Sequence, residues 1–263
     1  MKIGIIGAGN MGGSIAVGLA SSGKVNASDI VLCDVNEAAL AKYKAQFPAM
    51  TMSTDNSAAA AGTDMIIVVV KPWLLDEVMT NLQSQIDFKR QMLVSVVAGA
   101  TLDKLATFAG ADSDYAALFR MIPNLAIAQG ESMTFIAQRG ATEQQVQAVT
   151  DLFAAIGDVM VIEERQMGAC TALSSCGIAY VMRYLRAACE AAVELGLYPD
   201  QARRIMLQTM QGAVSLLNAT GNHPEVEIDR VTTPGGITIK GLNAMEANGF
   251  TRAVIEGIKA SVK

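Results

Sequence analysis

Short apolar runs alternate with helix-like segments through the first half of the chain. Two of these runs, 65–70 and 92–97, are almost continuously apolar, which is typical of strands buried on both faces. Strands are also expected at 2–6, 28–34, 50–52, 115–121 and 133–137, and helices at 14–20, 35–47 and 56–61. This alternation predicts an α/β fold, with a parallel sheet covered by helices on both faces.

The pattern changes from about residue 163, where strand signals give way to an alanine-rich stretch at 167–195 and a second helical stretch at 199–219. We expect two domains, 1–162 and 163–263, the second of them helical. The long helix expected over 167–195 is apolar on nearly every face, so we predict a homodimer through the C-terminal helices. The alternative is a single helical layer packed against the first domain.

Three glycines follow the first apolar run and precede the first expected helix. Gly7 permits a tight strand-to-helix turn, Gly9 lets the backbone approach a pyrophosphate, and Gly12 lets the helix pack closely on the strand. The helix N-terminus offers free N–H groups and a favourable dipole for phosphate. The segment therefore predicts a Rossmann dinucleotide-binding domain.

An aspartate, Asp34, ends the next expected strand about twenty residues after the last glycine, where such domains bind the adenosine ribose. A carboxylate there accepts hydrogen bonds from both ribose hydroxyls and repels a 2′-phosphate, so it favours NADH over NADPH. The alternative is that Asp34 caps the helix expected at 35–47.

Composition and charge argue against nucleic-acid, membrane and metal partners. The net charge of −5 and the lack of a basic stripe predict no nucleic-acid partner. The N-terminal apolar stretch suits a buried strand better than a signal peptide, so we expect a cytoplasmic protein with no membrane partner. His223, the only histidine, is expected in a surface loop. The cysteines Cys33, Cys170, Cys176 and Cys189 have neither metal-ligand nor disulfide spacing. We therefore expect no bound metal and four reduced thiols.

A Pro-Gly-Gly turn at 234–236 opens a further expected helix that runs to about Ala247. Adjacent glycines and a helix start let backbone N–H groups hold a small carboxylate. The alternative is a purely structural turn between two helices.

With these motifs the chain resembles the pyrroline-5-carboxylate reductases over essentially its whole length. The most specific part is the C-terminal block 231–239, with 241–242 and 246–250. The other matching segments are 6–12, 69–72, 95–99, 123–124 and 171–174.

The resemblance implies reduction of 1-pyrroline-5-carboxylate to L-proline with NADH or NADPH, in a homodimer or an oligomer of such dimers with the substrate site between subunits. The implied cofactor contacts are Ile6, Gly7, Ala8, Gly9, Asn10, Met11, Asn56, Val69, Val70, Lys71, Pro72, Val96, Val97 and Ala98, beside Asp34. The implied substrate contacts are Glu164, Thr233, Pro234, Gly235, Gly236, Ile237 and Thr238. Thr238 is implied as the catalytic residue that hydrogen-bonds the ring nitrogen. From the residues alone, Asn56 is equally a helix cap and Glu164 a solvated acid at a helix start.

Reduction of a protonated imine needs no catalytic acid, because the nitrogen already carries its proton. The absence of a lysine at 168–180 argues against the related β-hydroxyacid dehydrogenases. The chain departs from the family pattern at Leu125, Ala126, Ser175, Cys176 and Ile178, near the expected active site. Reduction of another cyclic imine or of a small 2-oxo or 3-hydroxy acid stays open, as does a non-catalytic dinucleotide-binding regulatory protein.

Overall fold

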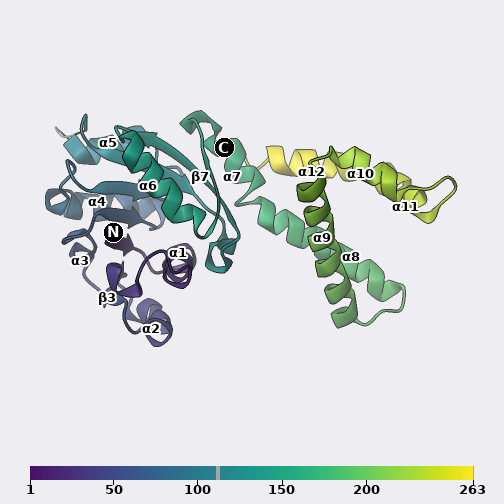
Figure 1. The fold of residues 1–263 in the computed structure, drawn as a ribbon, viewed down its shortest axis with the longest axis horizontal. Helices are drawn as coiled ribbons and strands as arrows, with labels where there is room; N and C mark the ends of the chain where they lie inside the picture. The colour runs from purple at the N-terminus through teal and green to yellow at the C-terminus, as the bar shows by residue number, and fades with distance from the viewer. Residues whose placement is uncertain (111–112, 263) are drawn as a thin grey trace. The chain divides into compact units, whose positions relative to one another are not determined.

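The computed structural model describes residues 1–110 and 113–262. The chain divides into two compact units, Met1–Ser175 and Cys176–Lys263 (Figure 1). Helix α7 (Met167–Leu173) follows the boundary predicted at 162/163 but packs against β7 (Ser132–Arg139), so it belongs to the first unit. The predicted functional division at 162/163 stays a prediction.

An eight-stranded sheet forms the centre of the first unit, in the order β3-β2-β1-β4-β5-β6-β7-β8. Neighbouring strands are parallel except β6 and β7. The strands besides β7 are β1 (Ile3–Ile6), β2 (Ile30–Cys33), β3 (Thr51–Ser53), β4 (Met65–Val68), β5 (Met92–Ser95), β6 (Ala117–Ile122) and β8 (Gly157–Val161). The order reverses at β1, between β2 and β4, and ligands of such sheets bind at this switch point.

The expected sheet is confirmed, with two corrections. β7 runs antiparallel to β6, because the connection after Ile122 is shorter than the dozen or so residues that a parallel crossover needs. The sequence analysis also misses β8, an edge strand in which no residue is buried, although its last three residues are apolar.

Apolar layers cover both faces of the sheet. Ile15 of α1 and Phe153 of α6 belong to one layer, whereas Met79 of α4 and Leu105 of α5 belong to the other. The helices of this unit besides α7 are α1 (Asn10–Ser21), α2 (Glu37–Gln46), α3 (Ser57–Ala60), α4 (Leu75–Leu82), α5 (Leu102–Ala109) and α6 (Glu143–Ala154).

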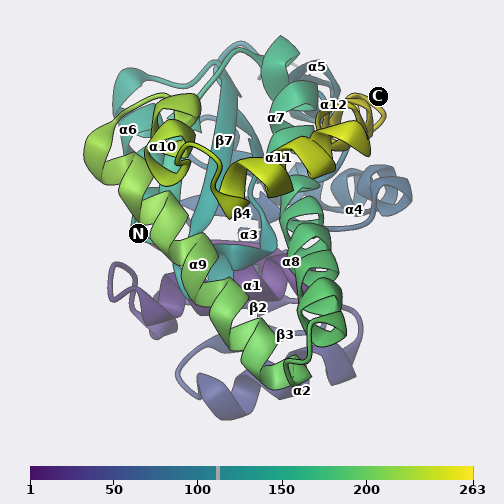
Figure 2. The same ribbon diagram turned by 90° about the vertical axis from the view of Figure 1, so that its right-hand side faces the viewer.

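The second unit is helical, as predicted, and its helices α8 and α9 form a hairpin (Figure 2). Its helices are α8 (Gly177–Glu194), α9 (Pro199–Thr220), α10 (Pro224–Val231), α11 (Ile237–Ala247) and α12 (Phe250–Lys259). None of the helices in the described part of the chain is long and apolar enough to span a membrane.

The long helix expected over 167–195 is wrong, because the chain breaks between α7 and α8. Ser174 donates a hydrogen bond to the Met133 carbonyl oxygen at 3.2 Å, and Ser175 donates one to the Pro123 carbonyl oxygen at 2.8 Å. Two successive serines thus bond to backbone outside their own segment, which favours a break over a continuous helix.

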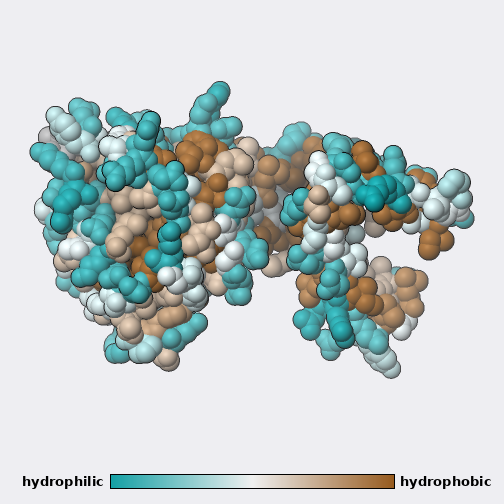
Figure 3. Space-filling view, viewed as in Figure 1, coloured by the Kyte–Doolittle hydropathy of each residue, from teal (hydrophilic) through white to brown (hydrophobic). Residues whose placement is uncertain are grey.

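The second unit lacks a core of its own. Ala202 and Glu227 are the only buried residues among those described in it, while large apolar side chains such as Met182, Leu195 and Ile237 are exposed. Apolar surface gathers on these helices (Figure 3). Exposed apolar area of this extent marks a surface that a partner covers.

Candidate functional site

The segments predicted to bind the cofactor meet at the carboxyl edge of the sheet. Backbone hydrogen bonds join the strand ends there: Gly7 N–H to the Cys33 carbonyl at 2.8 Å, Val69 N–H to the Ile6 carbonyl at 2.8 Å, and Val96 N–H to the Val68 carbonyl at 2.9 Å. The loops after β1, β2, β4 and β5 therefore share one edge, which the switch point of the sheet divides.

The glycine loop has the geometry that its sequence predicts. Gly7 adopts φ of 104°, a conformation that L side chains rarely adopt. A Cβ on Gly12 would overlap the Gly7 carbonyl oxygen, whereas a Cβ on Gly9 would meet nothing within 4 Å. Helix α1 begins at Asn10 without a side-chain cap. Open space above Gly9, next to uncapped N–H groups, fits a pyrophosphate.

Asp34, the residue directly after β2, holds the glycine loop in place. Its Oδ2 accepts a hydrogen bond from Ala8 N–H at 2.7 Å, and its Oδ1 accepts one from Asn36 N–H at 2.9 Å. The alternative that Asp34 caps α2 is wrong, because the N-cap is Asn36, whose Oδ1 accepts from Ala38 N–H. A carboxylate has about four acceptor sites, so Asp34 retains acceptor capacity for ribose hydroxyls.

Asn56 stands immediately before α3 but makes no side-chain capping bond, so the capping alternative fails there as well. The neighbouring Asp55 takes the Ser57 N–H at 2.9 Å and the Ser57 hydroxyl at 2.6 Å, and these bonds lower the pKa of the Asp55 carboxyl. Asn56 Oδ1 is buried without a hydrogen-bond partner. Buried acceptors are nearly always satisfied, so this oxygen fits a donor that a bound molecule supplies.

The loops after β4 and β5 complete the edge. Val69 and Val70 are half-buried, while Lys71 and Pro72 are exposed at the start of a short 3-10 helix, η2 (Pro72–Leu74). In the loop after β5, Val97 is buried, Val96 is half-buried and Ala98 is exposed. Both loops thus combine an apolar base with an accessible backbone, which suits a flat ring system.

Glu164 opens the 3-10 helix η6 (Glu164–Gln166), but it is not the solvated acid of the alternative interpretation. Its Oε1 accepts hydrogen bonds from Leu102 N–H at 2.8 Å and from Arg120 Nη1 at 2.9 Å. The side chain of Glu164 is 29% exposed and that of Arg120 is 15% exposed. Oε1 is thus occupied, and no bond to Oε2 is found within residues 1–110 and 113–262.

Sequence reasoning misses Arg120, the partner of Glu164. The signal is an arginine near the carboxyl end of an apolar strand, Ala117–Ile122, where a charge needs a partner. Asn124, quoted above only as part of a motif, is also buried. It donates to Ser174 Oγ at 3.0 Å and accepts from Ala126 N–H at 3.0 Å.

The Pro-Gly-Gly turn lies between α10 and α11, as predicted. Gly235 adopts φ of 72°, and Gly236 N–H donates to the Thr233 carbonyl at 2.9 Å. Helix α11 begins at Ile237 without a side-chain cap, and Thr238, its second residue, is exposed. Uncapped N–H groups beside an exposed hydroxyl are compatible with carboxylate binding.

The remaining polar candidates show no catalytic arrangement. His223 is exposed, and its Nδ1 accepts from Glu225 N–H at 3.3 Å as the N-cap of α10. The four cysteines are free thiols. Burial raises the pKa of the Cys33 thiol to about 11. Within the described residues, no group of His, Cys, Asp and Glu side chains is arranged to hold a metal ion.

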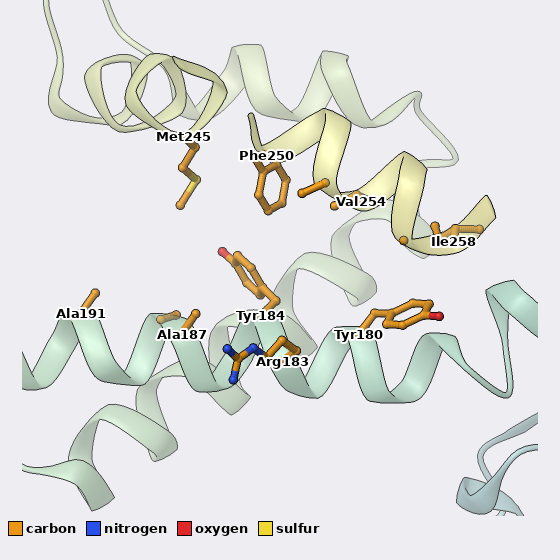
Figure 4. Close-up of a pocket in the computed structure, with 12 residues that line it drawn as sticks. Tyr180, Arg183, Tyr184, Ala187, Ala191, Met245, Phe250, Val254 and Ile258 are labelled. Carbon is orange, nitrogen blue, oxygen red and sulfur yellow. The ribbon is translucent and has the colours of Figure 1, made fainter. Parts of the chain in front are cut away.

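A cavity of about 450 Å³ opens within the second unit, between α8 and the helices α11 and α12 (Figure 4). Tyr184 of α8 meets Phe250 of α12 edge-on, with ring centroids 6.2 Å apart. The lining is almost entirely apolar: it comprises Tyr180, Arg183, Tyr184, Ala187, Ala188, Ala191, Met245, Phe250, Ala253, Val254, Gly257 and Ile258. A groove of this composition suits a packed helix better than a polar substrate.

Each of the two units resembles a known protein family. Residues 164–263 match the family model described as "Pyrroline-5-carboxylate reductase dimerisation", and residues 2–99 match "NADP oxidoreductase coenzyme F420-dependent". Pyrroline-5-carboxylate reductase 2 of Dictyostelium discoideum is 35% identical over 100% of this chain and 91% of its own length. Pyrroline-5-carboxylate reductase 1 of that organism is 34% identical over 98% of this chain, which spans only 48% of that longer protein.

The fold is also found in solved structures. The Plasmodium falciparum pyrroline carboxylate reductase with NADP bound has a TM-score of 0.89 and 25% identity to this chain, over 99% of this chain and 95% of that one. The similarity spans both units, so the pairing of a Rossmann sheet with this set of helices is shared.

Proposed function

The chain belongs to the pyrroline-5-carboxylate reductase family, and we propose that it reduces 1-pyrroline-5-carboxylate to L-proline with a reduced nicotinamide cofactor. The observation that carries the proposal is identity of 31–35% to reductases of this name over nearly the whole chain, on top of a carboxyl edge shaped for a dinucleotide. The activity is the last step of proline synthesis.

The cofactor would lie on the carboxyl edge of the first unit, where it supplies a hydride. The loop 6–11 would hold the pyrophosphate on backbone N–H groups, and Asn56 Oδ1 would gain the donor that it lacks. The loops 69–72 and 96–98 would line the rest of the dinucleotide. We propose a preference for NADH, because the carboxylate of Asp34, held against Ala8 N–H directly after β2, would face the adenosine ribose and repel a 2′-phosphate.

The substrate carboxylate would bind the turn from Thr233 to Ile237, and Thr238 would be the catalytic residue, with its hydroxyl on the ring nitrogen. The free first turn of α11 supports an anion there. Glu164 would contribute from the substrate pocket through Oε2, since Oε1 is held by Leu102 and Arg120.

Protonation of the imine removes the need for a catalytic acid, so binding and orientation supply most of the rate acceleration. The positive charge of the protonated imine is compatible with the carboxylate of Glu164. The reaction then requires an aimed hydride, a carboxylate anchor and one polar group at nitrogen, for which Thr238 is the candidate.

We further propose that the protein is a homodimer in which the partner's helices cover the groove between α8 and α12. The near absence of buried residues in the described part of the second unit supports this arrangement, and so does the match to a dimerisation family model. A cytoplasmic site of action is consistent with four free thiols, because disulfides are rare in that compartment.

The first test is the initial rate of nicotinamide oxidation with 1-pyrroline-5-carboxylate, measured with NADH and with NADPH. We expect substrate-dependent turnover that is more efficient with NADH. Better turnover with NADPH would retain the reductase and reject the Asp34 argument. Cofactor binding without turnover would point to another cyclic imine or to a regulatory role.

The second test addresses Thr238. Thr238→Ala is expected to lower kcat by about 100-fold, as for other lost transition-state hydrogen bonds, with cofactor affinity unchanged. Thr238→Ser keeps the hydroxyl and should retain most of the activity. Equal losses in both variants would argue against a role for the hydroxyl.

A further inference from the structure

One carboxylate stands out in the second unit. Glu227 of α10 is 5% exposed, in a unit whose described residues are otherwise almost all accessible to solvent. A buried carboxylate is unfavourable unless its charge is paired and hydrogen-bonded. The partners of Glu227 therefore indicate what its burial achieves.

Glu227 is bound from both ends of its helix. Asn222 Nδ2, in the linker between α9 and α10, donates to Glu227 Oε1 at 2.7 Å. Arg230 Nη1, in the last turn of α10, donates to Oε1 at 3.1 Å and to Oε2 at 2.8 Å. The hydrogen bond from Asn222 and the charge of Arg230 lower the pKa of the Glu227 carboxyl, so it stays ionised.

These contacts lock a short helix. Helix α10 has 8 residues, a length at which a helix is marginal in isolation, so the bonds that Glu227 makes to Asn222 before the helix and to Arg230 in its last turn support it. Its C-terminal end leads directly into the Pro-Gly-Gly turn: Thr232 N–H donates to the Ile228 carbonyl at 3.1 Å, and Thr232 Oγ1 donates to the Asp229 carbonyl at 3.0 Å. The orientation of α10 therefore determines where the turn at Thr233 lies.

We propose that Glu227 is a positioning residue for the substrate carboxylate. It fastens α10 to the linker that follows α9, and so holds the turn from Thr233 to Ile237 in the orientation that binds the anion. The inference rests on the proposed function of that turn. It adds a positioning role for a residue that touches neither substrate nor cofactor.

The test compares Glu227→Leu, which removes every bond at similar volume, with Glu227→Gln, which retains one acceptor. We expect the KM for 1-pyrroline-5-carboxylate to rise about tenfold in Glu227→Leu and by less in Glu227→Gln, because uniform substrate binding is weakened. The kcat should fall less than about threefold, and the Kd for NADH should not change, since the cofactor residues lie in the first unit.

The matched control is Glu225→Gln, an exposed acid in the first turn of the same helix, which should leave KM unchanged. Asn222→Ala provides a second, milder disruption if Glu227→Leu does not fold. An unchanged KM in Glu227→Gln and Asn222→Ala, or an equal rise in Glu225→Gln, would overturn the inference while the reductase activity stands. A wild-type protein without turnover would overturn the proposed function first, and this inference with it.

Discussion

Asp34 Oδ2 accepts a hydrogen bond from the backbone N–H of Ala8 at 2.7 Å, which joins the end of β2 to the glycine loop after β1. A residue that the sequence marks for cofactor selection thus also supports the phosphate-binding loop. The two roles can be separated, because one needs the charge of the carboxylate and the other needs only an acceptor.

Substitution of Asp34 by Asn removes the charge and keeps one acceptor, which can serve Ala8 N–H while the bond from Asn36 N–H is lost. We expect the preference for NADH over NADPH, measured as the ratio of the two kcat/KM values, to fall by about 10- to 100-fold, since each tenfold step is about 1.4 kcal/mol. Asp34→Ala removes both features and should also reduce efficiency with NADH. A ratio that is unchanged in Asp34→Asn would reject the electrostatic basis of the preference.

Because Asn56 Oδ1 has no hydrogen-bond partner, its removal is expected to affect cofactor binding and protein stability in opposite directions. Substitution by Ala removes a buried acceptor that lacks a donor in the chain, and such an acceptor costs about 1–3 kcal/mol when unsatisfied. We therefore expect Asn56→Ala to weaken cofactor binding about tenfold, while thermal unfolding of the cofactor-free protein stays the same or shifts upward.

The matched control is Asn36→Ala. Asn36 caps α2 through Ala38 N–H, so its loss should cost about 1 kcal/mol of stability without altering cofactor affinity. Titration of the nicotinamide fluorescence and a melting curve check both variants. Loss of stability in Asn56→Ala with unchanged cofactor affinity would mean that Asn56 is structural.

Much of this architecture follows from local pattern. Buried parallel strands read as apolar runs, so β1, β2, β4 and β5 can be predicted, and their shared direction brings the cofactor loops to one edge. The turn at Gly235 and the start of α11 follow from the special conformational freedom of glycine.

The features that sequence misses depend on contacts between distant residues. The break before α8 depends on Ser174 and Ser175, whose acceptors lie 41 and 52 positions away along the chain. The partner of Glu164 is Arg120, 44 positions away. No local periodicity encodes such pairs. The antiparallel direction of β7 depends on the length of a loop rather than on the residues of the strand.

The pair between Arg120 and Glu164 should matter more than a surface pair does. Arg120→Met leaves the Glu164 carboxylate half-buried with one bond fewer, so we expect the free energy of unfolding to fall by about 1–3 kcal/mol. Urea unfolding at a fixed protein concentration measures this change, because the stability of the proposed dimer would depend on concentration.

The control for Arg120 is Arg139→Met. Arg139 pairs with Asp103 at 2.7 Å, but their side chains are 43% and 90% exposed. Exposed pairs contribute about 0–1 kcal/mol, so this variant should be close to wild type. An equal fall in the free energy of unfolding of both variants would show that burial does not make the Arg120–Glu164 pair more stabilising than an exposed pair.

The buried thiol of Cys33 is expected to make alkylation and stability depend on pH. Burial raises the pKa of its thiol from 9.0 to about 11, so the thiolate that reacts with alkylating agents is scarce in the folded protein. We expect iodoacetamide at about pH 8 to leave Cys33 unmodified in the native protein and to modify it after unfolding, as peptide mass mapping can show. The unfolded thiol ionises first, so this contribution to stability is complete below pH 9.0 and is lost as the pH rises toward about 11. Cys189, which is only half-buried, serves as the internal reference, and labelling of native Cys33 at the same rate would contradict its burial.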